Sequence, residues 1–214
     1  SGNVTEGNII VNTTDKGTVR LILNNASISN TTTAPIKVLD AKKVILTLAD
    51  NTTNTITDSS RLSTEEDYSA VIYSKEDLII NGNGTLNVNA GYRNGIKSTD
   101  DCIIVSGTLN ITSTEDGIIG KDLCGIVAGD ININAGSDGI KSTYDTDTTK
   151  GNVIIEGGNI TIKASNDGIQ AENILVINDG TINIKTNNGA ADTTQTHIDN
   201  MDMGRGGFGF NNNK

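Results

Sequence analysis

The segment Asn94-Gly95-Ile96 decides the fold, because close copies of it recur at nearly constant intervals along the chain. The copies are Asp116-Gly117-Ile118, Asp138-Gly139-Ile140, Asp167-Gly168-Ile169 and, in a weaker form, Asn188-Gly189-Ala190. They follow one another at steps of 22, 22, 29 and 21 residues. A repeat of this size is typical of a solenoid, in which each copy occupies one coil. Equivalent residues of successive coils should therefore lie about 4.8 Å apart, the spacing of paired strands.

Each repeat also contains a short segment in which apolar and polar residues alternate strictly, the pattern of a half-buried strand. Its apolar residues predict two inward rows, which are Leu86, Leu109, Ile131, Ile160 and Ile182, and Val88, Ile111, Ile133, Ile162 and Ile184. Its polar residues predict an outward row of Asn87, Asn110, Asn132, Thr161 and Asn183. A second strand precedes this segment, and the Gly-Ile segment begins a short third. The sequence therefore predicts an all-β solenoid, a parallel β-helix of about seven or eight coils.

The composition suits such a tube, because aliphatic rows can fill a narrow interior without large side chains. Only 3% of the residues are aromatic, and there is no Trp. The net charge of −10 argues against binding to nucleic acid, which needs clustered basic residues. No apolar run approaches the length of about 18 residues that a membrane span requires. We expect a mature secreted or cell-surface protein, since the chain begins at Ser1 without a leader.

The two ends of the chain differ from the repeats. We expect residues 1–16 to form an extended N-terminal segment, residues 17–192 the β-helix, and residues 193–214 a tail rich in Gly and Asn. The open ends of a β-helix expose unpaired backbone groups, which favour pairing with other chains. Residues 8–12 or 203–210 could therefore add a strand to another copy of the chain.

Acidic residues recur with the same period and are candidate metal ligands. One column should contain Asp116, Asp138 and Asp167, flanked by Asn94 and Asn188. Ca²⁺ prefers oxygen ligands and would relieve the repulsion between stacked carboxylates. The alternative is that Asn and Asp before Gly cap turns. Two further columns are Glu76, Asp100 and Asp122, and Asp77 and Asp101, while the inserted segment 143–149 adds Asp145 and Asp147. The candidate calcium ligands are thus Asp100, Asp101, Asp116, Asp122, Asp138, Asp145, Asp147 and Asp167.

Four residues are candidates for contact with carbohydrate. Tyr68 and Tyr92 precede equivalent positions of neighbouring coils and should stack, as aromatic rings that bind sugars do, unless they only close turns. Lys97 and Lys141 follow the repeated segment. A metal and a basic side chain are what β-elimination of an acidic sugar needs, but each lysine could equally offset the acidic columns. The outward Asn and Thr rows could bind polysaccharide, ice or protein, or simply be solvated.

Other catalytic chemistry has little support in the sequence. His197 is the only histidine and lies outside the repeats, so that no Ser/His or Cys/His pair can form within the coils. Cys102 and Cys124 are 22 residues apart and should occupy equivalent positions in neighbouring coils. Two cysteines and a distant histidine do not make a usual zinc site. We expect buried thiols, with a disulfide as the alternative.

Several segments together resemble the secreted clostridial carbohydrate-binding β-helix proteins. They are Tyr73-Ser74-Lys75-Glu76-Asp77-Leu78, Asn94-Gly95-Ile96-Lys97-Ser98, Asp138-Gly139-Ile140-Lys141-Ser142, Lys150-Gly151 and Asp167-Gly168-Ile169-Gln170-Ala171-Glu172. The resemblance covers about residues 17–190 and implies a right-handed parallel β-helix similar to family 9 polysaccharide lyases. It also implies calcium binding, and binding of cellulose or acidic polysaccharide rather than cleavage. Asn94 departs from the family, which usually has Asp there.

Three functional hypotheses follow. The first is an extracellular, non-catalytic calcium-binding protein that binds a cell-wall-type or acidic polysaccharide such as cellulose or pectin. The second is a structural subunit of an extracellular surface filament, in which copies of the chain join through their terminal segments. The third and least supported is a calcium-dependent polysaccharide lyase that uses Lys97 or Lys141 as its base.

Overall fold

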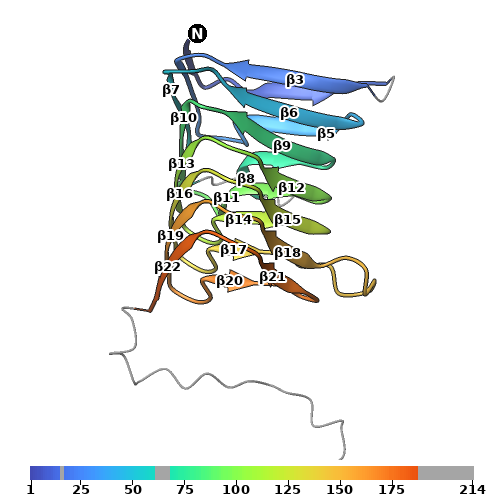
Figure 1. Cartoon of the computed structure of the whole chain (residues 1–214). Helices are drawn as coiled ribbons and strands as arrows, with labels where there is room; N and C mark the ends of the chain where they lie inside the picture. Colours follow the sequence, from blue (N-terminus) through green and yellow to red (C-terminus); the bar gives the residue numbers. More distant parts are fainter. Residues whose placement is uncertain (15–16, 61–67, 188–214) are drawn as a thin grey trace, which may run out of the picture.

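The structure, a computed structural model, describes residues 1–14, 17–60 and 68–187. These residues form a right-handed parallel β-helix that contains strands but no α-helix (Figure 1). The 22 strands form three parallel sheets of eight, seven and seven strands, which we name A, B and C. The chain passes through A, B and C in turn, so the strands make seven complete coils followed by one further strand of sheet A.

The three sheets run the whole length of the stack. Sheet A contains β1 (Gly2–Thr5), β4 (Ala26–Asn30), β7 (Thr53–Asp58), β10 (Thr85–Ala90), β13 (Thr108–Ser113), β16 (Asp130–Ala135), β19 (Asn159–Ala164) and β22 (Thr181–Thr186). Sheet B contains β2 (Ile9–Asn12), β5 (Ile36–Asp40), β8 (Ala70–Ser74), β11 (Asn94–Ser98), β14 (Ile118–Gly120), β17 (Ile140–Lys141) and β20 (Ile169–Gln170). Sheet C contains β3 (Thr18–Leu23), β6 (Lys43–Leu48), β9 (Asp77–Gly82), β12 (Asp101–Ile104), β15 (Leu123–Ile126), β18 (Asn152–Ile155) and β21 (Leu175–Ile177).

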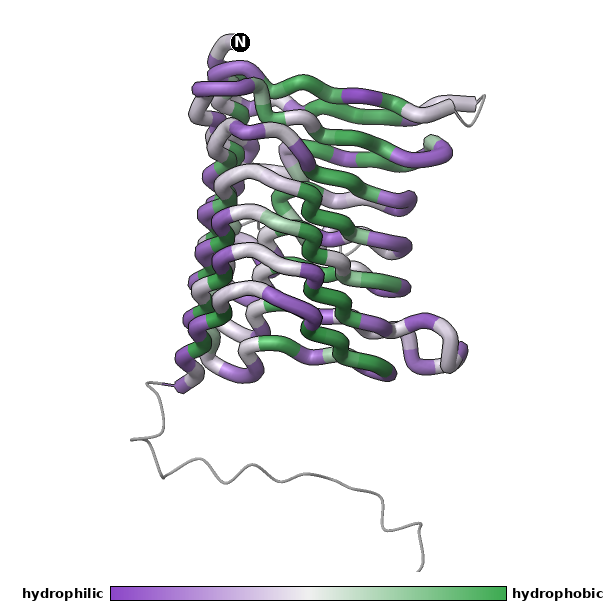
Figure 2. The backbone as a smooth tube through the Cα atoms, in the orientation of Figure 1, coloured by the Kyte–Doolittle hydropathy of each residue, from purple (hydrophilic) through white to green (hydrophobic). Residues whose placement is uncertain are grey.

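Aliphatic side chains stacked in rows form the core of the tube. In sheet B, Ile96 pairs with Ile118, Ile118 with Ile140, and Ile140 with Ile169. In sheet A, one continuous register joins Leu86, Leu109, Ile131, Ile160 and Ile182. These pairings confirm the inward rows that the sequence predicts. Figure 2 shows the result as apolar strand segments that recur in every coil and alternate with polar segments. Full burial of each such side chain stabilises the fold by about 1.5–3 kcal/mol.

The glycine of the repeated segment is required by the close approach of neighbouring coils. Gly117 accepts a hydrogen bond at its carbonyl from the backbone N–H of Ile96, at 3.0 Å, and so lies directly against the coil above. A Cβ atom on Gly117 would lie 2.5 Å from the carbonyl oxygen of Gly139 and 2.6 Å from the Ile133 side chain. No real side chain tolerates such contacts, so glycine is needed here in the coils of Gly95, Gly117, Gly139 and Gly168. The coil above Gly95 differs, because Val71 occupies the equivalent position.

The N-terminal residues belong to the β-helix. Residues 1–16, which we expected to form a separate extended segment, contain β1 and β2, and these strands pair with β4 and β5. Ile9 and Val11 continue the rows of Ile36 and Val38, so the stack begins at Gly2 rather than at residue 17. The expected tail at 193–214, the fifth copy of the repeat at 188–190 and His197 lie outside the described residues.

Two further sequence expectations concern the cysteines and the membrane. Cys102 and Cys124 are register partners, and both are free and completely buried, as predicted. Burial raises the pKa of the Cys124 thiol to about 12, which keeps it unreactive. Within the described ranges, the structure has no helix that is long and apolar enough to cross a membrane.

Replacement of Gly117 by Ala should destabilise the protein, because the added methyl group overlaps the backbone of the next coil. We expect a loss of about 1–3 kcal/mol in the free energy of unfolding, measured by urea titration. Gly125→Ala is the matched control, because its Cβ would lie 3.5 Å from Ile103, an ordinary contact. Equal stability of the two variants would contradict the close-approach explanation.

Candidate functional site

The first acidic column, Asn94, Asp116, Asp138 and Asp167, connects successive coils through hydrogen bonds. The Oδ1 atom of Asn94 accepts a hydrogen bond from the backbone N–H of Asp116 at 3.0 Å. Asp116 accepts one from Asp138 in the same way, and Asp138 accepts one from Asp167, both at 3.0 Å. We call this arrangement the Asx ladder. It shows why Asn or Asp must precede the repeated glycine.

Lys141 neutralises the middle of the Asx ladder. Its Nζ atom lies 2.6 Å from Asp138 Oδ2 and 3.9 Å from Asp116 Oδ2. Burial by itself would raise the pKa of Asp138, but the hydrogen bonds from Lys141 and from the backbone of Asp167 outweigh burial and lower it. Burial would likewise lower the pKa of Lys141, yet its hydrogen bond to Asp138 and the charge of Asp116 raise it. The carboxylates of Asp116 and Asp138 thus have partners within the protein, as turn capping and charge offset require. Calcium binding by this column stays a prediction.

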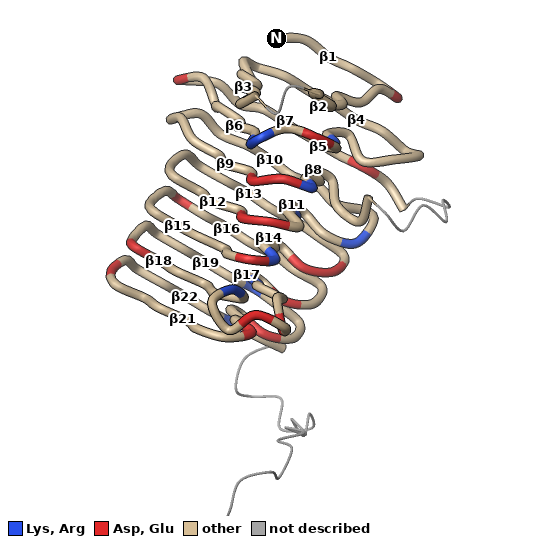
Figure 3. Tube along the Cα trace, turned by 90° about the vertical axis from the view of Figure 1, so that its right-hand side faces the viewer, with Lys and Arg blue, Asp and Glu red and all other residues tan. Residues whose placement is uncertain are grey.

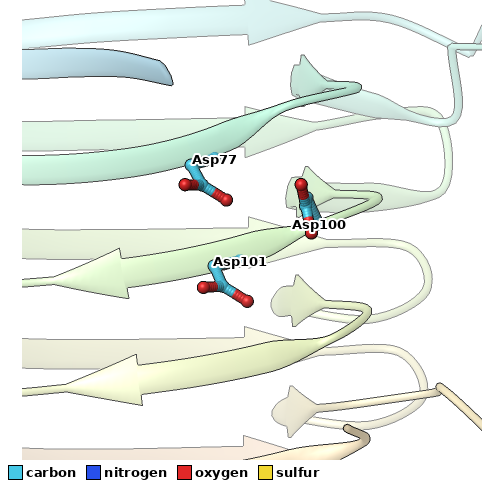
Figure 4. A group of neighbouring side chains, drawn as sticks. All are labelled: Asp77, Asp100 and Asp101. Atoms are coloured by element: carbon cyan, nitrogen blue, oxygen red, sulfur yellow. The ribbon is translucent and has the colours of Figure 1, made fainter. Parts of the chain in front are cut away.

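A second group of carboxylates lies at the turns between sheets B and C. Asp77 begins β9, Asp101 begins β12, and Asp100 lies in the turn just before β12 (Figure 4). One carboxylate oxygen from each of the three lies within 4.8 Å of the others, and all three side chains are half-buried. We call these residues the acidic turn cluster. Figure 3 shows that the acidic turns of successive coils stack along this edge of the molecule.

Local hydrogen bonds hold the turn of the cluster in place. The Ser98 hydroxyl donates to the carbonyl of Glu76 at 2.8 Å and accepts from the backbone N–H of Asp100 at 3.1 Å. The carbonyl of Asp100 in turn accepts from the backbone N–H of Asp122 at 3.3 Å. Hydrogen bonds between coils therefore fix the backbone of the cluster, while its carboxylates face one another.

The electrostatics of the acidic turn cluster differ from those of the Asx ladder. Burial, a hydrogen bond with Asp122 and the charge of Asp77 raise the pKa of Asp100 to about 6. Burial and the charges of Asp77 and Asp122 also raise the pKa of Asp101. Among the described residues, no Lys or Arg lies within 4.0 Å of the three carboxylates of the cluster. The donor set suits a hard cation such as Ca²⁺, which takes six to eight oxygen ligands, some of them from water or a ligand.

Asp122 lies next to the cluster but has its own cation. Its Oδ2 atom lies 2.5 Å from Lys150 Nζ, and the hydrogen bond to Asp122 raises the pKa of Lys150. The inserted segment 143–149 brings Tyr144 beside this pair. The ammonium groups of Lys150 and Lys121 each lie 4.9 Å from the centre of the Tyr144 ring. Tyr144 of the insertion and the ammonium groups of Lys121 and Lys150 thus lie beside the acidic edge below the cluster.

The remaining candidate ligands, Asp145 and Asp147, lie on the inserted segment and are not part of the cluster. With Glu172 and Asn173 they line a shallow hollow of about 140 Å³. Asp147 accepts hydrogen bonds from the backbone and the hydroxyl of Thr149, which lower its pKa. Asp147 therefore shapes its own turn, and calcium binding by these two residues stays a prediction.

The candidate carbohydrate residues lie on the outer side of sheet B or next to it. The Lys37 ammonium lies 4.8 Å from the centre of the Tyr68 ring, and Tyr68 packs edge-on against Tyr73 with ring centres 5.4 Å apart. Arg93 lies over Tyr92 at 5.6 Å. We call this surface, together with Lys97, the sheet B face. It combines aromatic rings with cations, a pairing suited to acidic sugars.

Lys97 and Lys141 lie in the same outward row but have different surroundings. Lys97 and Lys141 pair through Ile119, which lies between them. Lys97 donates a hydrogen bond to the Ser69 hydroxyl at 3.2 Å, and burial and the nearby charge of Arg93 lower its pKa. Lys141 is instead bound to the Asx ladder. Lys97 is therefore the candidate that faces a ligand, while Lys141 serves the fold.

Sequence reasoning missed three residues of the sheet B face. Lys37 and Tyr73 lie in the same row as Lys97, with Lys37 paired to Tyr73 and Tyr73 to Lys97. The row escapes a period search because its members are 36 and 24 residues apart in the longer early coils. The third residue is Arg93, which directly follows Tyr92. Its position next to Tyr92, in the turn before the repeated segment, could have identified Arg93 as part of this face from the sequence.

Comparison with known proteins places the chain in a family. A family model described as "Carbohydrate-binding domain-containing protein" matches residues 1–207, and the chain belongs to this family. A protein of the same description from Acetivibrio thermocellus is 36% identical over 115 residues, which make up 52% of this chain and 40% of that relative's length. Among solved structures, a gadolinium derivative of a polysaccharide lyase-like protein from C. thermocellum is similar, with a TM-score of 0.76 and 33% identity. The superposition covers 87% of this chain and 80% of that protein.

Replacement of Asp138 by Ala should strongly destabilise the protein, because it leaves Lys141 and the backbone N–H of Asp167 without their acceptor. We expect a loss of about 3–5 kcal/mol in the free energy of unfolding, measured by urea titration in the presence of a chelator. Because the folded-state pKa of Asp138 is lowered, its contribution is present at neutral pH and is lost as the pH falls through that pKa. Asp145→Ala, an exposed change, is the control; an equal loss there would contradict this role of the ladder.

Proposed function

We propose that this member of the carbohydrate-binding domain family is an extracellular protein that binds an acidic polysaccharide without cleaving it, using Ca²⁺ at the acidic turn cluster. One observation carries the proposal. Three carboxylates of the cluster face one another, and no described Lys or Arg lies within 4.0 Å of them, although Lys43 is the register partner of Asp77. Asp100 and Asp101 follow Lys97 of the sheet B face by three and four residues. A calcium ion there would offer open coordination positions to the carboxylate of a sugar.

The contrast between the two acidic columns supports the calcium part of the proposal. The protein neutralises the Asx ladder with Lys141 and pairs Asp122 with Lys150. It gives Asp77, Asp100 and Asp101 no such partner among the described residues, and burial together with the charges of Asp77 and Asp122 raises the pKa of Asp100 and Asp101. Such a cluster costs folding free energy unless a cation fills it. The similar solved structure is a gadolinium derivative, and gadolinium is likewise a hard cation.

The sheet B face supports the sugar part of the proposal. Lys37, Arg93 and Lys97 lie on or beside one face of a chain whose net charge is −10. Glu115 lies 3.8 Å from Arg93 and offsets part of this positive charge, which leaves Lys37 and Lys97 as the cations of the face that have no carboxylate within 4.0 Å among the described residues. Tyr68 and Tyr92 lie between these cations and offer ring faces or edges for stacking. A neutral polysaccharide such as cellulose would use the rings, whereas an acidic one would use both rings and charges.

A lyase activity is the second candidate, and the lowered pKa of Lys97 is what favours it. A lysine that loses its proton more readily can act as the base that removes a sugar's α-proton. The carboxylate of the sugar would need to be held by the metal at the same time. New ultraviolet absorbance from unsaturated product on pectate, lost in Lys97→Gln, would establish this activity in place of simple binding.

Filament formation stays a separate prediction. At the last coil the inward rows end with Leu175, Ile177 and Ile184 between 46% and 49% exposed. At the first coil, β2 has one free edge, since its other edge pairs with β5. Both ends therefore offer strand edges to another copy, and electron microscopy of the purified protein tests for filaments.

Calcium should stabilise the wild-type protein, because the ion binds the folded cluster and not the unfolded chain. The Asp100→Asn variant should differ from wild type in opposite directions under the two conditions. At pH 7 in chelator the variant should be more stable than wild type, whereas in excess Ca²⁺ it should be less stable. The reason is that the pKa of Asp100, about 6 against 3.8 for an ordinary aspartate, makes its charged form unfavourable in the folded protein. The wild type without calcium should accordingly lose stability as the pH rises through 6.

Thermal unfolding at several pH values, with and without Ca²⁺, measures both effects. Asp145→Asn is the matched control, since Asp145 lies outside the cluster and should keep the full calcium-induced shift. A calcium shift of normal size in an Asp100→Asn/Asp101→Asn double variant would place the ion elsewhere.

The sugar proposal is tested by affinity electrophoresis through gels that contain polygalacturonate, pectin or soluble cellulose derivatives. We expect calcium to increase retardation by polygalacturonate, and Lys97→Gln or Tyr92→Ala to reduce it several-fold. Arg20→Gln, an exposed change on β3 of sheet C, is the charge-matched control for Lys97→Gln. Identical mobility in all gels, with and without Ca²⁺, would refute carbohydrate binding.

A further inference from the structure

The outer surface of sheet A presents two straight rows of polar side chains. The first row, which we call the asparagine row, runs through Asn87, Asn110, Asn132, Thr161 and Asn183. The second, which we call the lysine row, runs through Asn89, Thr112, Asn134, Lys163 and Lys185. The strands labelled β7 to β22 in Figure 1 show how straight this sheet is along the stack.

In the upper half of this surface, from β10 to Asn132 of β16, side chains form hydrogen bonds with equivalent residues of the neighbouring coils. The Asn110 amide donates to the Asn87 carbonyl oxygen at 2.9 Å, and the Asn132 amide donates to Asn110 at 3.1 Å. In the lysine row, the Asn89 amide donates to the Thr57 hydroxyl at 3.2 Å. In the upper half, some donors and acceptors of the two rows are therefore already engaged in hydrogen bonds within the protein.

The lower half of the surface, by which we mean the residues of the two rows on β16, β19 and β22 other than Asn132, lacks such partners. Asn134, Thr161 and Asn183 make no side-chain hydrogen bond with any described residue. Lys163 and Lys185 are direct register partners and are both exposed. Neither has an ion-pair partner in the described part of the chain. Two like charges opposite each other in a sheet are destabilising, and an anion between them would remove the repulsion.

The two lysines border the hollows of this surface. Three shallow hollows of about 260, 300 and 360 Å³ lie along β13 to β22, and Lys163 lines all three. Asn134 lines two of them, and Lys185 also lines two. None of the carboxylates in the described part of the chain lines any of the three. Asp130, the acidic residue at the start of β16, lies beside Asn159, at the opposite end of the strands.

We propose that the lower half of sheet A is a second binding surface for an acidic polysaccharide, independent of calcium, in which Lys163 and Lys185 hold carboxylate groups and Asn134, Thr161 and Asn183 hydrogen-bond hydroxyl groups. The substrate class rests on the proposed function, but the site does not share a residue with the acidic turn cluster or the sheet B face. An extended chain of pyranose rings lying along the stack would meet a new donor at each coil, about 4.8 Å apart. Charge-assisted hydrogen bonds to carboxylates are the strong ones, so the lysines should contribute most.

The test is affinity electrophoresis in polygalacturonate gels that contain EDTA, so that calcium-dependent binding is switched off. We expect wild type to be retarded and Lys163→Gln/Lys185→Gln to bind about tenfold more weakly, as expected for the loss of two largely solvent-exposed charge contacts. Both substitutions are at exposed positions and remove a repulsion, so they should not lower the temperature of thermal unfolding. Arg20→Gln/Lys42→Gln, which removes the same charge from exposed positions of the first coils, should bind like wild type.

Two outcomes would overturn the proposal. One is equal binding of Lys163→Gln/Lys185→Gln and wild type in EDTA; the other is an equal loss in Arg20→Gln/Lys42→Gln, which would reveal a non-specific effect of charge. Asp100→Asn/Asp101→Asn separates this proposal from the calcium proposal, because it should abolish only the retardation that Ca²⁺ adds. If calcium adds nothing while the two lysines still matter in EDTA, this surface stands and the calcium site fails.

Discussion

The in-register stacking of parallel strands is the constraint on which this structure depends. Each coil repeats the residue types of the coil above, so hydrogen bonds along three sheets hold every side chain over its equivalent. Stacking is favourable for Ile118 and its neighbours, which fill the tube without aromatic side chains. It is unfavourable for charged residues, because a repeated carboxylate always meets another carboxylate about 4.8 Å away.

The protein resolves this repulsion differently at its two acidic edges. In the Asx ladder, Asp116 and Asp138 accept backbone hydrogen bonds from the next coil and share Lys141. At the turns between sheets B and C, no described lysine lies within 4.0 Å of the carboxylates of Asp100 and Asp101, although Asp122 just below them has Lys150. The stacked lysines Lys163 and Lys185 of sheet A are the opposite case, because two positive charges lie side by side with no described carboxylate as an ion-pair partner. These uncompensated columns of charge are therefore the places at which we propose binding sites.

The sequence predicted the fold well because the repeat is strict where the core is. The alternation around Leu109 and the Gly-Ile segments led directly to the sheet registers that the structure has. The roles of the acidic residues were harder to predict. Periodicity places Asp116 and Asp100 in equally plausible columns, and only the position of Lys141 in space distinguishes them. The irregular early coils also hid Lys37, since their lengths break the period that links it to Lys97.

The most direct measurement is an anomalous-diffraction experiment on crystals of the wild-type protein soaked in a lanthanide that replaces Ca²⁺. The account predicts a strong peak in contact with Asp77, Asp100 and Asp101, and none at Asp116 and Asp138, where Lys141 already supplies the positive charge. A peak at the Asx ladder, or no peak at the acidic turn cluster under saturating metal, would contradict it.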